Sequence, residues 1–151
     1  MNLLFLCTGN SCRSQMAEGW ARHFAGKSIS PLKLEVRSAG LEAHGLNERA
    51  VAAMHRQGVD ISAQSSDVLN DELVDWADMM ITVCADADEN CPLLPARIKK
   101  RHMGFVDPAK AEGSDAEIEK QFDDVCRQIR DSVLKLLTEL TSELVSSTSY
   151  R

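Results

Sequence analysis

The sequence predicts a single α/β domain, a four-stranded parallel sheet with helices on both faces. Segments typical of strands alternate along the chain with segments whose apolar residues recur at helical spacing, the order that builds parallel sheets. The 151 residues fit one domain, and 44% hydrophobic with 26% charged residues is ordinary for a globular protein. We expect the domain to span residues 1–145 and residues 146–151 to form a flexible tail.

The first half of the chain predicts two strands and two helices. Residues 3–7 form a continuous apolar run that favours a buried strand, and residues 14–24 carry apolar side chains at helical spacing. Residues 33–38 alternate apolar with charged side chains, which favours a second strand. Residues 47–57 predict a helix that begins at a capping asparagine and is followed by glycine.

The second half predicts a short helix, two strands and a long helix. Residues 70–76 begin with an asparagine cap, residues 79–84 are a buried strand, and residues 102–105 are a weaker one. Ser114 caps the final helix, whose apolar stripe comprises Ile118, Phe122, Val125, Ile129, Val133, Leu136, Leu137 and Leu140.

Charge and hydropathy exclude several function classes. The 17 Lys and Arg against 23 Asp and Glu give a net charge of −6, which argues against a general nucleic-acid or anionic-membrane binder. No apolar run approaches the roughly 18 residues of a membrane span, and no basic segment precedes the first apolar run as in a signal peptide. We therefore expect a cytoplasmic protein.

The segment after the first strand, residues 7–14, reads Cys-Thr-Gly-Asn-Ser-Cys-Arg-Ser. Backbone N–H groups of a tight loop can converge on an anion, and the following helix N-terminus adds donors and positive potential. Gly9 and Asn10 tolerate a left-handed backbone. Arg13 can grip two oxygens of an oxyanion, and the same charges would stabilise a Cys7 thiolate, to which Ser14 could donate.

The whole loop is therefore a candidate oxyanion site. Its alternative interpretation is a structural strand-to-helix turn with a buried thiol, because a cysteine and an arginine six residues apart is a weak motif without the strand and helix around it. The predicted substrate-binding residues are Thr8, Gly9, Asn10, Ser11, Cys12, Arg13 and Ser14.

A second pair of cysteines brackets a polar segment. Cys84 ends the third predicted strand, and Cys91 follows after six residues. If that segment is helical, the sulfurs lie about 10 Å apart, whereas a disulfide needs Cα atoms within roughly 7 Å, so bridging would require rearrangement. A buried Cys84 and an incidental Cys91 is the alternative. A zinc site is disfavoured because the spacing exceeds the usual two to four residues.

Asp107 follows the fourth predicted strand and precedes Pro108. A carboxyl group at that edge could protonate a leaving oxygen of a substrate held in the loop. An ordinary Asp-Pro turn is the alternative.

Together these segments resemble the thioredoxin-coupled arsenate reductases, which share the fold of low-molecular-weight protein tyrosine phosphatases. The resemblance covers about residues 2–138. It rests on the following segments: residues 7–20, Ser-Ala-Gly at 38–40, His44-Gly45, Ser66-Asp67, the segment from Cys84 to Pro92, Gly104-Phe105 and Asp107-Pro108-Ala109.

The resemblance implies a relay of three thiols. Cys7 attacks arsenic(V) held by Arg13 and the loop amides, and Asp107 assists departure of water. Cys84 then attacks Cys7 and releases arsenite, and Cys91 attacks Cys84. Thioredoxin reduces the resulting Cys84–Cys91 disulfide. The chain has no nicotinamide or flavin fingerprint, so no tightly bound cofactor is expected and thiols must supply the two electrons.

The resemblance also implies a potassium ion beside the loop and a monomeric protein. The corresponding ligands are Asn10, Glu18, Ser38, Ser65 and Asp67, with Ser65 standing where threonine is more usual.

Two other functions stay open. A low-molecular-weight protein tyrosine phosphatase would use Cys7, Arg13 and Asp107 through a phosphocysteine, but Gln15 stands where such phosphatases have proline, and Cys84 and Cys91 would lack a role. Weak phosphatase activity is still expected, because arsenate and phosphate share shape and charge. The other is a thiol module that binds arsenite or zinc, or senses redox state. We assign Cys12 and Cys126 to packing.

Overall fold

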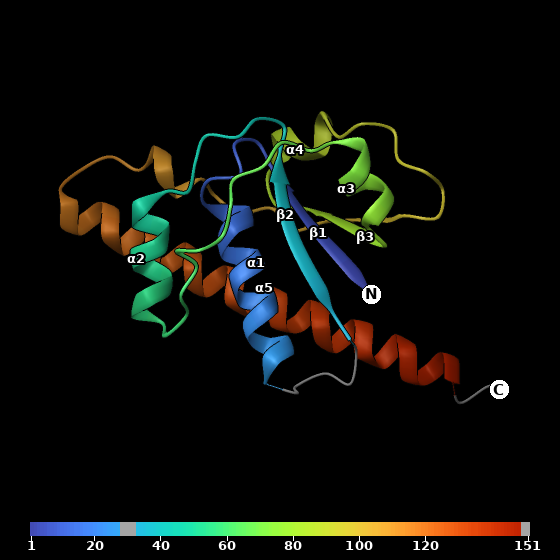
Figure 1. The fold of residues 1–151 in the computed structure, drawn as a ribbon. Helices are drawn as coiled ribbons and strands as arrows, with labels where there is room; N and C mark the ends of the chain where they lie inside the picture. The colour runs from blue at the N-terminus through green and yellow to red at the C-terminus, as the bar shows by residue number, and fades with distance from the viewer. Residues whose placement is uncertain (28–32, 149–151) are drawn as a thin grey trace.

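The computed structural model describes residues 1–27 and 33–148. Within these residues the sheet has four parallel strands, β1 (Asn2–Cys7), β2 (Glu35–Gly40), β3 (Met79–Thr82) and β4 (Lys99–His102), in the order β2-β1-β3-β4 (Figure 1). The predicted fold class is confirmed. Because β1 and β3 are adjacent, the segments that follow them emerge side by side at the carboxyl edge of the sheet, where such sheets bind ligands.

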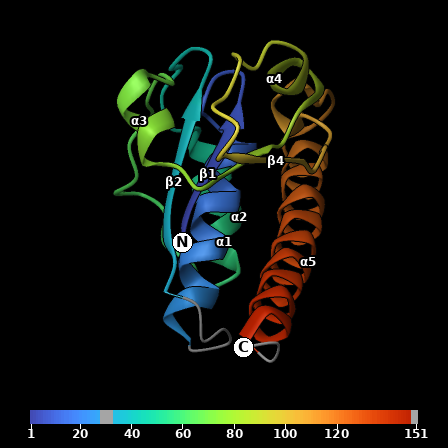
Figure 2. The ribbon, with the colours of Figure 1, turned by 90° about the vertical axis from the view of Figure 1, so that its right-hand side faces the viewer.

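Helices cover both faces of the sheet. Figure 2 shows α1 (Arg13–Gly26), α2 (Glu48–Arg56) and α5 (Asp115–Thr148) on one side of the strands and α3 (Asp71–Trp76) on the other. The short helix α4 (Ala85–Glu89) packs against β1 and β3, and the 3-10 helix η1 (Pro108–Lys110) packs against α5.

The core explains the apolar runs in the sequence. Residues 3–6 of β1 are fully buried, as expected for a central parallel strand covered on both faces. On the helical side, the indole Nε1 of Trp20 donates to the backbone carbonyl of Cys126, at 3.1 Å, which ties α1 to α5.

The predicted helix starts are confirmed by their caps. The side-chain oxygen of Asn47 accepts from the backbone N–H groups of Arg49 and Ala50 at the start of α2, and that of Asn70 accepts from Leu73 in α3. Ser114 Oγ accepts from the backbone N–H of Glu117 at the start of α5, at 3.2 Å. Each cap satisfies a donor that would otherwise have no helical partner.

Most predicted boundaries are shifted by one or two residues, as for β2 and β3, and the structure differs further from the sequence prediction in three places. The strand expected at residues 102–105 is wrongly placed, because β4 comprises the polar residues Lys99–His102, at the edge of the sheet, where no apolar pattern is required. The segment after Cys84 contains α4. Helix α5 continues to Thr148, so residues 146–148 are helical and not part of a flexible tail, and residues 149–151 lie outside the described residues.

Among the described residues, each helix is too short or too polar to cross a lipid bilayer.

Candidate active site

A cavity of about 680 Å³ opens beside the carboxyl ends of β1 and β3. The loop between β1 and α1 contributes Cys7 and Arg13, the start of α4 contributes Cys84, and the segment around η1 contributes Asp107. The fold therefore brings four of the five predicted catalytic residues to one cavity, while Cys91 lies outside its lining.

The loop of residues 7–14 holds Cys7 at its base. The Cys7 sulfur is buried and lies 2.8 Å from Ser14 Oγ. Ser14 Oγ accepts a hydrogen bond from Asn10 Nδ2 at 2.8 Å, which leaves its own hydrogen to donate to the sulfur. The predicted contact between Ser14 and Cys7 is thus present. Asn10 and Ser14 lie behind the cavity, which is lined by Thr8, Gly9, Ser11, Cys12 and Arg13.

Close packing sets the shape of the loop. Asn10 adopts a left-handed backbone with φ 48°, as the sequence predicted, whereas Gly9, named for the same reason, does not have a positive φ. A Cβ atom on Gly9 would lie 2.4 Å from the ring nitrogen Nδ1 of His44, and one on Gly40 would lie 2.2 Å from the carbonyl oxygen of Glu42. Neither position can therefore hold a larger residue without movement of the backbone or of His44.

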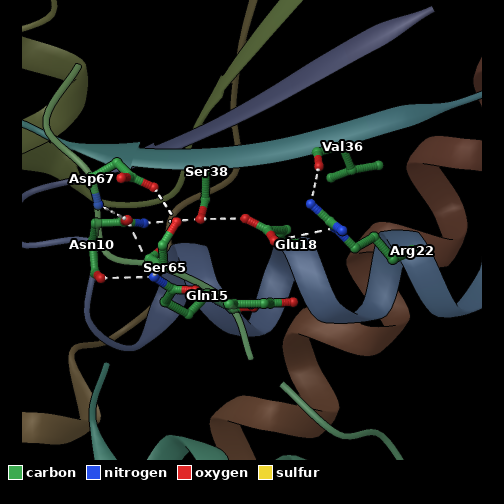
Figure 3. Close-up of polar contacts among 9 residues, drawn as sticks. Asn10, Gln15, Glu18, Arg22, Val36, Ser38, Ser65 and Asp67 are labelled. Atoms are coloured by element: carbon green, nitrogen blue, oxygen red, sulfur yellow. Dashed lines mark hydrogen bonds and ion pairs between the residues drawn. The ribbon is translucent and has the colours of Figure 1, made fainter. Parts of the chain in front are cut away.

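The Asn10 side chain fastens the loop to its surroundings (Figure 3). Its nitrogen also donates to Ser38 Oγ at 2.9 Å, and its oxygen accepts from the backbone N–H of Asp67 at 2.8 Å. Gln15 donates to the backbone carbonyls of Asn10 and Ser65, at 3.0 and 2.8 Å. The loop is therefore held in shape before any substrate arrives, and the sequence analysis missed this role of Gln15.

Arg13 and Asp107 face each other at the cavity. Arg13 Nη2 lies 3.5 Å from Asp107 Oδ2, while Nη1 donates to the carbonyl of Phe105 at 3.2 Å. Asp107 Oδ1 accepts from the backbone N–H of Ala109 at 3.0 Å, so it also caps η1. An oxyanion gripped by Arg13 would lie beside this carboxyl group.

Cys84 is the N-cap residue of α4. Its sulfur accepts from the backbone N–H of Ala87 at 3.4 Å, so it caps the first turn of the helix. The same sulfur lies 3.5 Å from Thr8 Oγ1, and that hydroxyl donates to Asp86 Oδ2 at 2.7 Å. The second thiol is thus coupled directly to the loop that holds Cys7.

Cys91 lies beyond the far end of α4, where its sulfur is 3.6 Å from Met80 Sδ. Cys84 caps the start of α4 and Cys91 follows its end, so the two are separated by about 10 Å at roughly 1.5 Å of helix rise per residue. This separation exceeds the roughly 7 Å that a disulfide spans, so α4 must rearrange before Cys91 meets Cys84. Burial raises the pKa of the Cys91 thiol, which keeps it protonated in this arrangement.

The remaining cysteines are packed as thiols. Burial raises the pKa of Cys12 to about 12, and it raises the pKa of Cys126, whose sulfur lies 3.4 Å from Met54 Sδ. A thiol with so high a pKa is a poor nucleophile at neutral pH. Both observations support the assignment of these two cysteines to packing.

The five predicted potassium ligands lie together behind the loop. Glu18, Ser38, Ser65 and Asp67 line a second cavity, of about 520 Å³. Ser38 Oγ donates to Glu18 Oε1 at 2.7 Å, Ser65 Oγ donates to Asp67 Oδ2, and burial raises the pKa of Glu18.

These four residues fit a potassium ion because they present oxygen atoms, including a buried carboxyl group that a cation would stabilise as a carboxylate. The side-chain nitrogen of Asn10 donates to Ser38 Oγ, and its side-chain oxygen accepts from the backbone N–H of Asp67 and from Gln15 Nε2. Asn10 therefore supports the cluster through hydrogen bonds and does not present its side-chain oxygen as a ligand.

Three further residues with ionisable side chains line the active-site cavity, namely His44, Asp86 and Lys110. None was predicted to bind substrate. Asp86 lies two residues after Cys84 and so shares the first turn of α4, a signal that was present in the sequence. His44 reaches the cavity by contact with Gly9, which nothing in the local sequence indicates.

Comparison with known proteins agrees with this geometry. The family model for low molecular weight phosphotyrosine protein phosphatases matches residues 2–146. The chain belongs to this family. Within it, the chain is similar to the arsenate reductase of Bacillus subtilis, with 46% identity over 91% of this chain and 92% of that protein. It is 54% identical to the arsenate reductase of Shouchella clausii over 76% of this chain and 79% of that protein.

Solved structures of the family show the same fold. An arsenate reductase in its reduced state is 30% identical, with a TM-score of 0.67 over 92% of this chain and 98% of that one. The YwlE arginine phosphatase from Geobacillus stearothermophilus has a TM-score of 0.76 at 21% identity, over 96% of each chain. The phosphatase likeness is evidence for the fold alone, whereas sequence identity is higher to the arsenate reductases.

Proposed function

We propose that this protein reduces arsenate to arsenite through Cys7, Cys84 and Cys91, with thioredoxin as the final reductant. The observation that carries the proposal is the meeting of Cys7, Arg13, Cys84 and Asp107 at one cavity, with Cys91 at the far end of the short helix that begins after Cys84. Similarity to arsenate reductases over most of the chain supports the same activity.

In the first step the Cys7 thiolate attacks arsenic(V). Arg13 and the loop amides neutralise the oxyanion, and Ser14 stabilises the thiolate by donating to it. A sulfur–arsenic bond forms and an arsenic–oxygen bond breaks. Asp107, in its protonated form, gives its proton to the departing oxygen, which leaves as water.

In the second step Cys84 attacks the Cys7 sulfur. The sulfur–sulfur bond forms, the sulfur–arsenic bond breaks, and its electron pair leaves with arsenic as arsenite. Arsenic gains two electrons and the two sulfurs lose them, so the balance closes without a bound cofactor.

In the third step Cys91 attacks Cys84 after α4 rearranges, and Cys7 leaves as a thiolate. The Cys84–Cys91 disulfide then closes the segment that contains α4. The side chains of Ala85, Glu89 and Asn90 in this segment are exposed, so a protein reductant can reach it. Thioredoxin restores both thiols by exchange.

A potassium ion held by Glu18, Ser38, Ser65 and Asp67 is proposed as a structural support for the loop. When bound, it supplies positive charge behind the oxyanion site. The residues of this chain keep the loop in shape through the Asn10 contacts with Ser38 and Asp67.

The deciding experiment is arsenate-dependent NADPH consumption in the presence of thioredoxin and thioredoxin reductase. Wild type should consume NADPH steadily. Cys91→Ser should complete one turnover and stop with a Cys7–Cys84 disulfide, because no third thiol can release Cys7. Sustained turnover of Cys91→Ser would contradict the relay.

A phosphatase is the second candidate, favoured by the family match and by the shared positions of Cys7, Arg13 and Asp107. It would hydrolyse aryl phosphates through a phosphocysteine and would not need Cys84 or Cys91. Absence of arsenate-dependent NADPH consumption, together with efficient aryl phosphate hydrolysis, would favour it.

A further inference from the structure

Asp86 enters the active-site cavity from the first turn of α4, and no step above uses it. Its carboxylate is held by two donors. Thr8 Oγ1 donates to Oδ2 at 2.7 Å and Asn90 Nδ2 donates to Oδ1 at 2.8 Å. A carboxylate can only accept, so the hydroxyl hydrogen of Thr8 points at Asp86.

The orientation of the Thr8 hydroxyl determines which atom donates in the contact between Thr8 and Cys84. The two atoms Thr8 Oγ1 and Cys84 Sγ are 3.5 Å apart. Because the hydroxyl hydrogen is already directed at Asp86, the hydrogen in this contact is the S–H of Cys84, donated to a lone pair of Thr8. A continuous path therefore runs from the Cys84 thiol through the Thr8 hydroxyl to Asp86.

We infer that Asp86 accepts the Cys84 proton through Thr8 when Cys84 attacks Cys7, a role that rests on the proposed arsenate reduction. Thr8 takes the thiol proton and passes its own to Asp86, while Cys84 bonds to Cys7 and the arsenic–sulfur electron pair leaves with arsenite. Asp86 is exposed and returns the proton to solvent. Since it acts through Thr8, Asp86 is a positioning residue.

Other titratable groups of the cavity have different partners or positions. His44 is paired with Glu42, and Asp107, which becomes a carboxylate in the first step, is paired with Arg13 and caps η1. Arg13 and Lys110 are cations, and the thiols of Cys7 and Cys12 belong to the loop itself. Asp86 is the carboxylate hydrogen-bonded to Thr8, which makes it the proton acceptor that the geometry offers to Cys84.

The test is the rate of Cys7–Cys84 disulfide formation after one addition of arsenate to reduced Cys91→Ser protein, followed by mass spectrometry from neutral to alkaline pH. In this Cys91→Ser background, Asp86→Asn should slow the step roughly 100-fold at neutral pH, the lower end of what a positioned proton acceptor contributes. The rate should return to that of the parent at alkaline pH, where hydroxide removes the thiol proton. Asp86→Glu, which keeps a carboxylate, should recover part of the neutral-pH rate.

Glu89→Gln is the matched control, because it removes the same charge from an exposed position of the same helix. It should keep the parent rate at every pH. Aryl phosphate hydrolysis should be unchanged in Glu89→Gln as well, because this side chain lies outside the cavity lining.

Two results overturn the inference alone. One is a parent-like rate for Asp86→Asn at neutral pH, and the other is a slow rate that does not recover at alkaline pH. Failure of the parent itself to form the disulfide contradicts the proposed function, and the inference with it.

Discussion

The loop of residues 7–14 and the segment of residues 84–91 each bring a cysteine to the same cavity, and they are fastened in opposite ways. Asn10, which is fully buried, ties the first to α1, β2 and the Asp67 segment. The second is tied by carboxylates that are exposed or partly exposed: Asp86 accepts from Thr8 at 2.7 Å, and Asp88 pairs with Lys100 at 3.0 Å and accepts from Thr82 at 3.2 Å. The loop of residues 7–14 must keep its shape to bind an oxyanion. The segment of residues 84–91 must detach and rearrange so that Cys91 can reach Cys84.

The largest effects are expected from replacing Cys7 or Cys84, one cysteine from each segment. Cys7→Ser should abolish both arsenate reduction and aryl phosphate hydrolysis, because both begin with this nucleophile. Cys84→Ser should abolish arsenate reduction and leave phosphate hydrolysis within a few-fold of wild type. Parallel assays on both variants measure this, and loss of phosphate hydrolysis in Cys84→Ser would show that the two segments do not act separately.

The second prediction compares two asparagines. Asn10→Ala removes buried hydrogen bonds and replaces asparagine, which tolerates the left-handed backbone at φ 48°, with alanine, which tolerates it less, so the free energy of unfolding should fall by about 2–4 kcal/mol. Asn90→Ala, at the exposed end of α4, should cost about 0.5 kcal/mol or less. Urea denaturation measures both.

A glycine variant separates the two causes of the stability loss in Asn10→Ala, namely the missing hydrogen bonds and the positive φ. Asn10→Gly tolerates the positive φ and should recover about 1 kcal/mol relative to Asn10→Ala. If Asn10→Ala and Asn90→Ala lowered the free energy of unfolding equally, the two segments would not differ in how firmly they are attached.

The third prediction concerns the attachment of α4. Lys100→Met should speed closure of the Cys84–Cys91 disulfide a few-fold and increase hydrogen exchange in α4, while α1 exchange stays unchanged. The Lys100 contact lowers the pKa of Asp88, so this attachment holds at neutral pH and weakens as pH falls and Asp88 is protonated. Faster exchange in α1 as well would indicate general destabilisation.

The smallest effect is expected at Cys12. Because burial raises its pKa to about 12, Cys12 stays a thiol at pH values well below that, and iodoacetamide should leave it unlabelled in the folded protein. Cys12→Ala should retain activity within about threefold of wild type. Peptide mapping after labelling checks the first point, and rapid labelling of Cys12 would contradict it.

The sequence predicted those features that local pattern determines. The β1 run, the asparagine caps and the loop of Cys7 and Arg13 are encoded by neighbouring residues, and all are present. The edge strand Lys99–His102 has no apolar pattern to reveal it. The contacts of Gln15 with Ser65, of His44 with Gly9 and of Thr8 with Asp86 join residues far apart in the chain, so only the folded structure reveals them.

The edge strand β4 also bears on behaviour in concentrated solution. Its sequence Lys-Lys-Arg-His places consecutive basic side chains along the last strand of the sheet. A second copy that approached this strand to extend the sheet would bring basic side chains close to one another, which opposes edge-to-edge pairing of the two sheets. We expect the same residues that concealed the strand from pattern analysis to oppose self-association at this edge, and we expect added salt to weaken that effect by screening the charges.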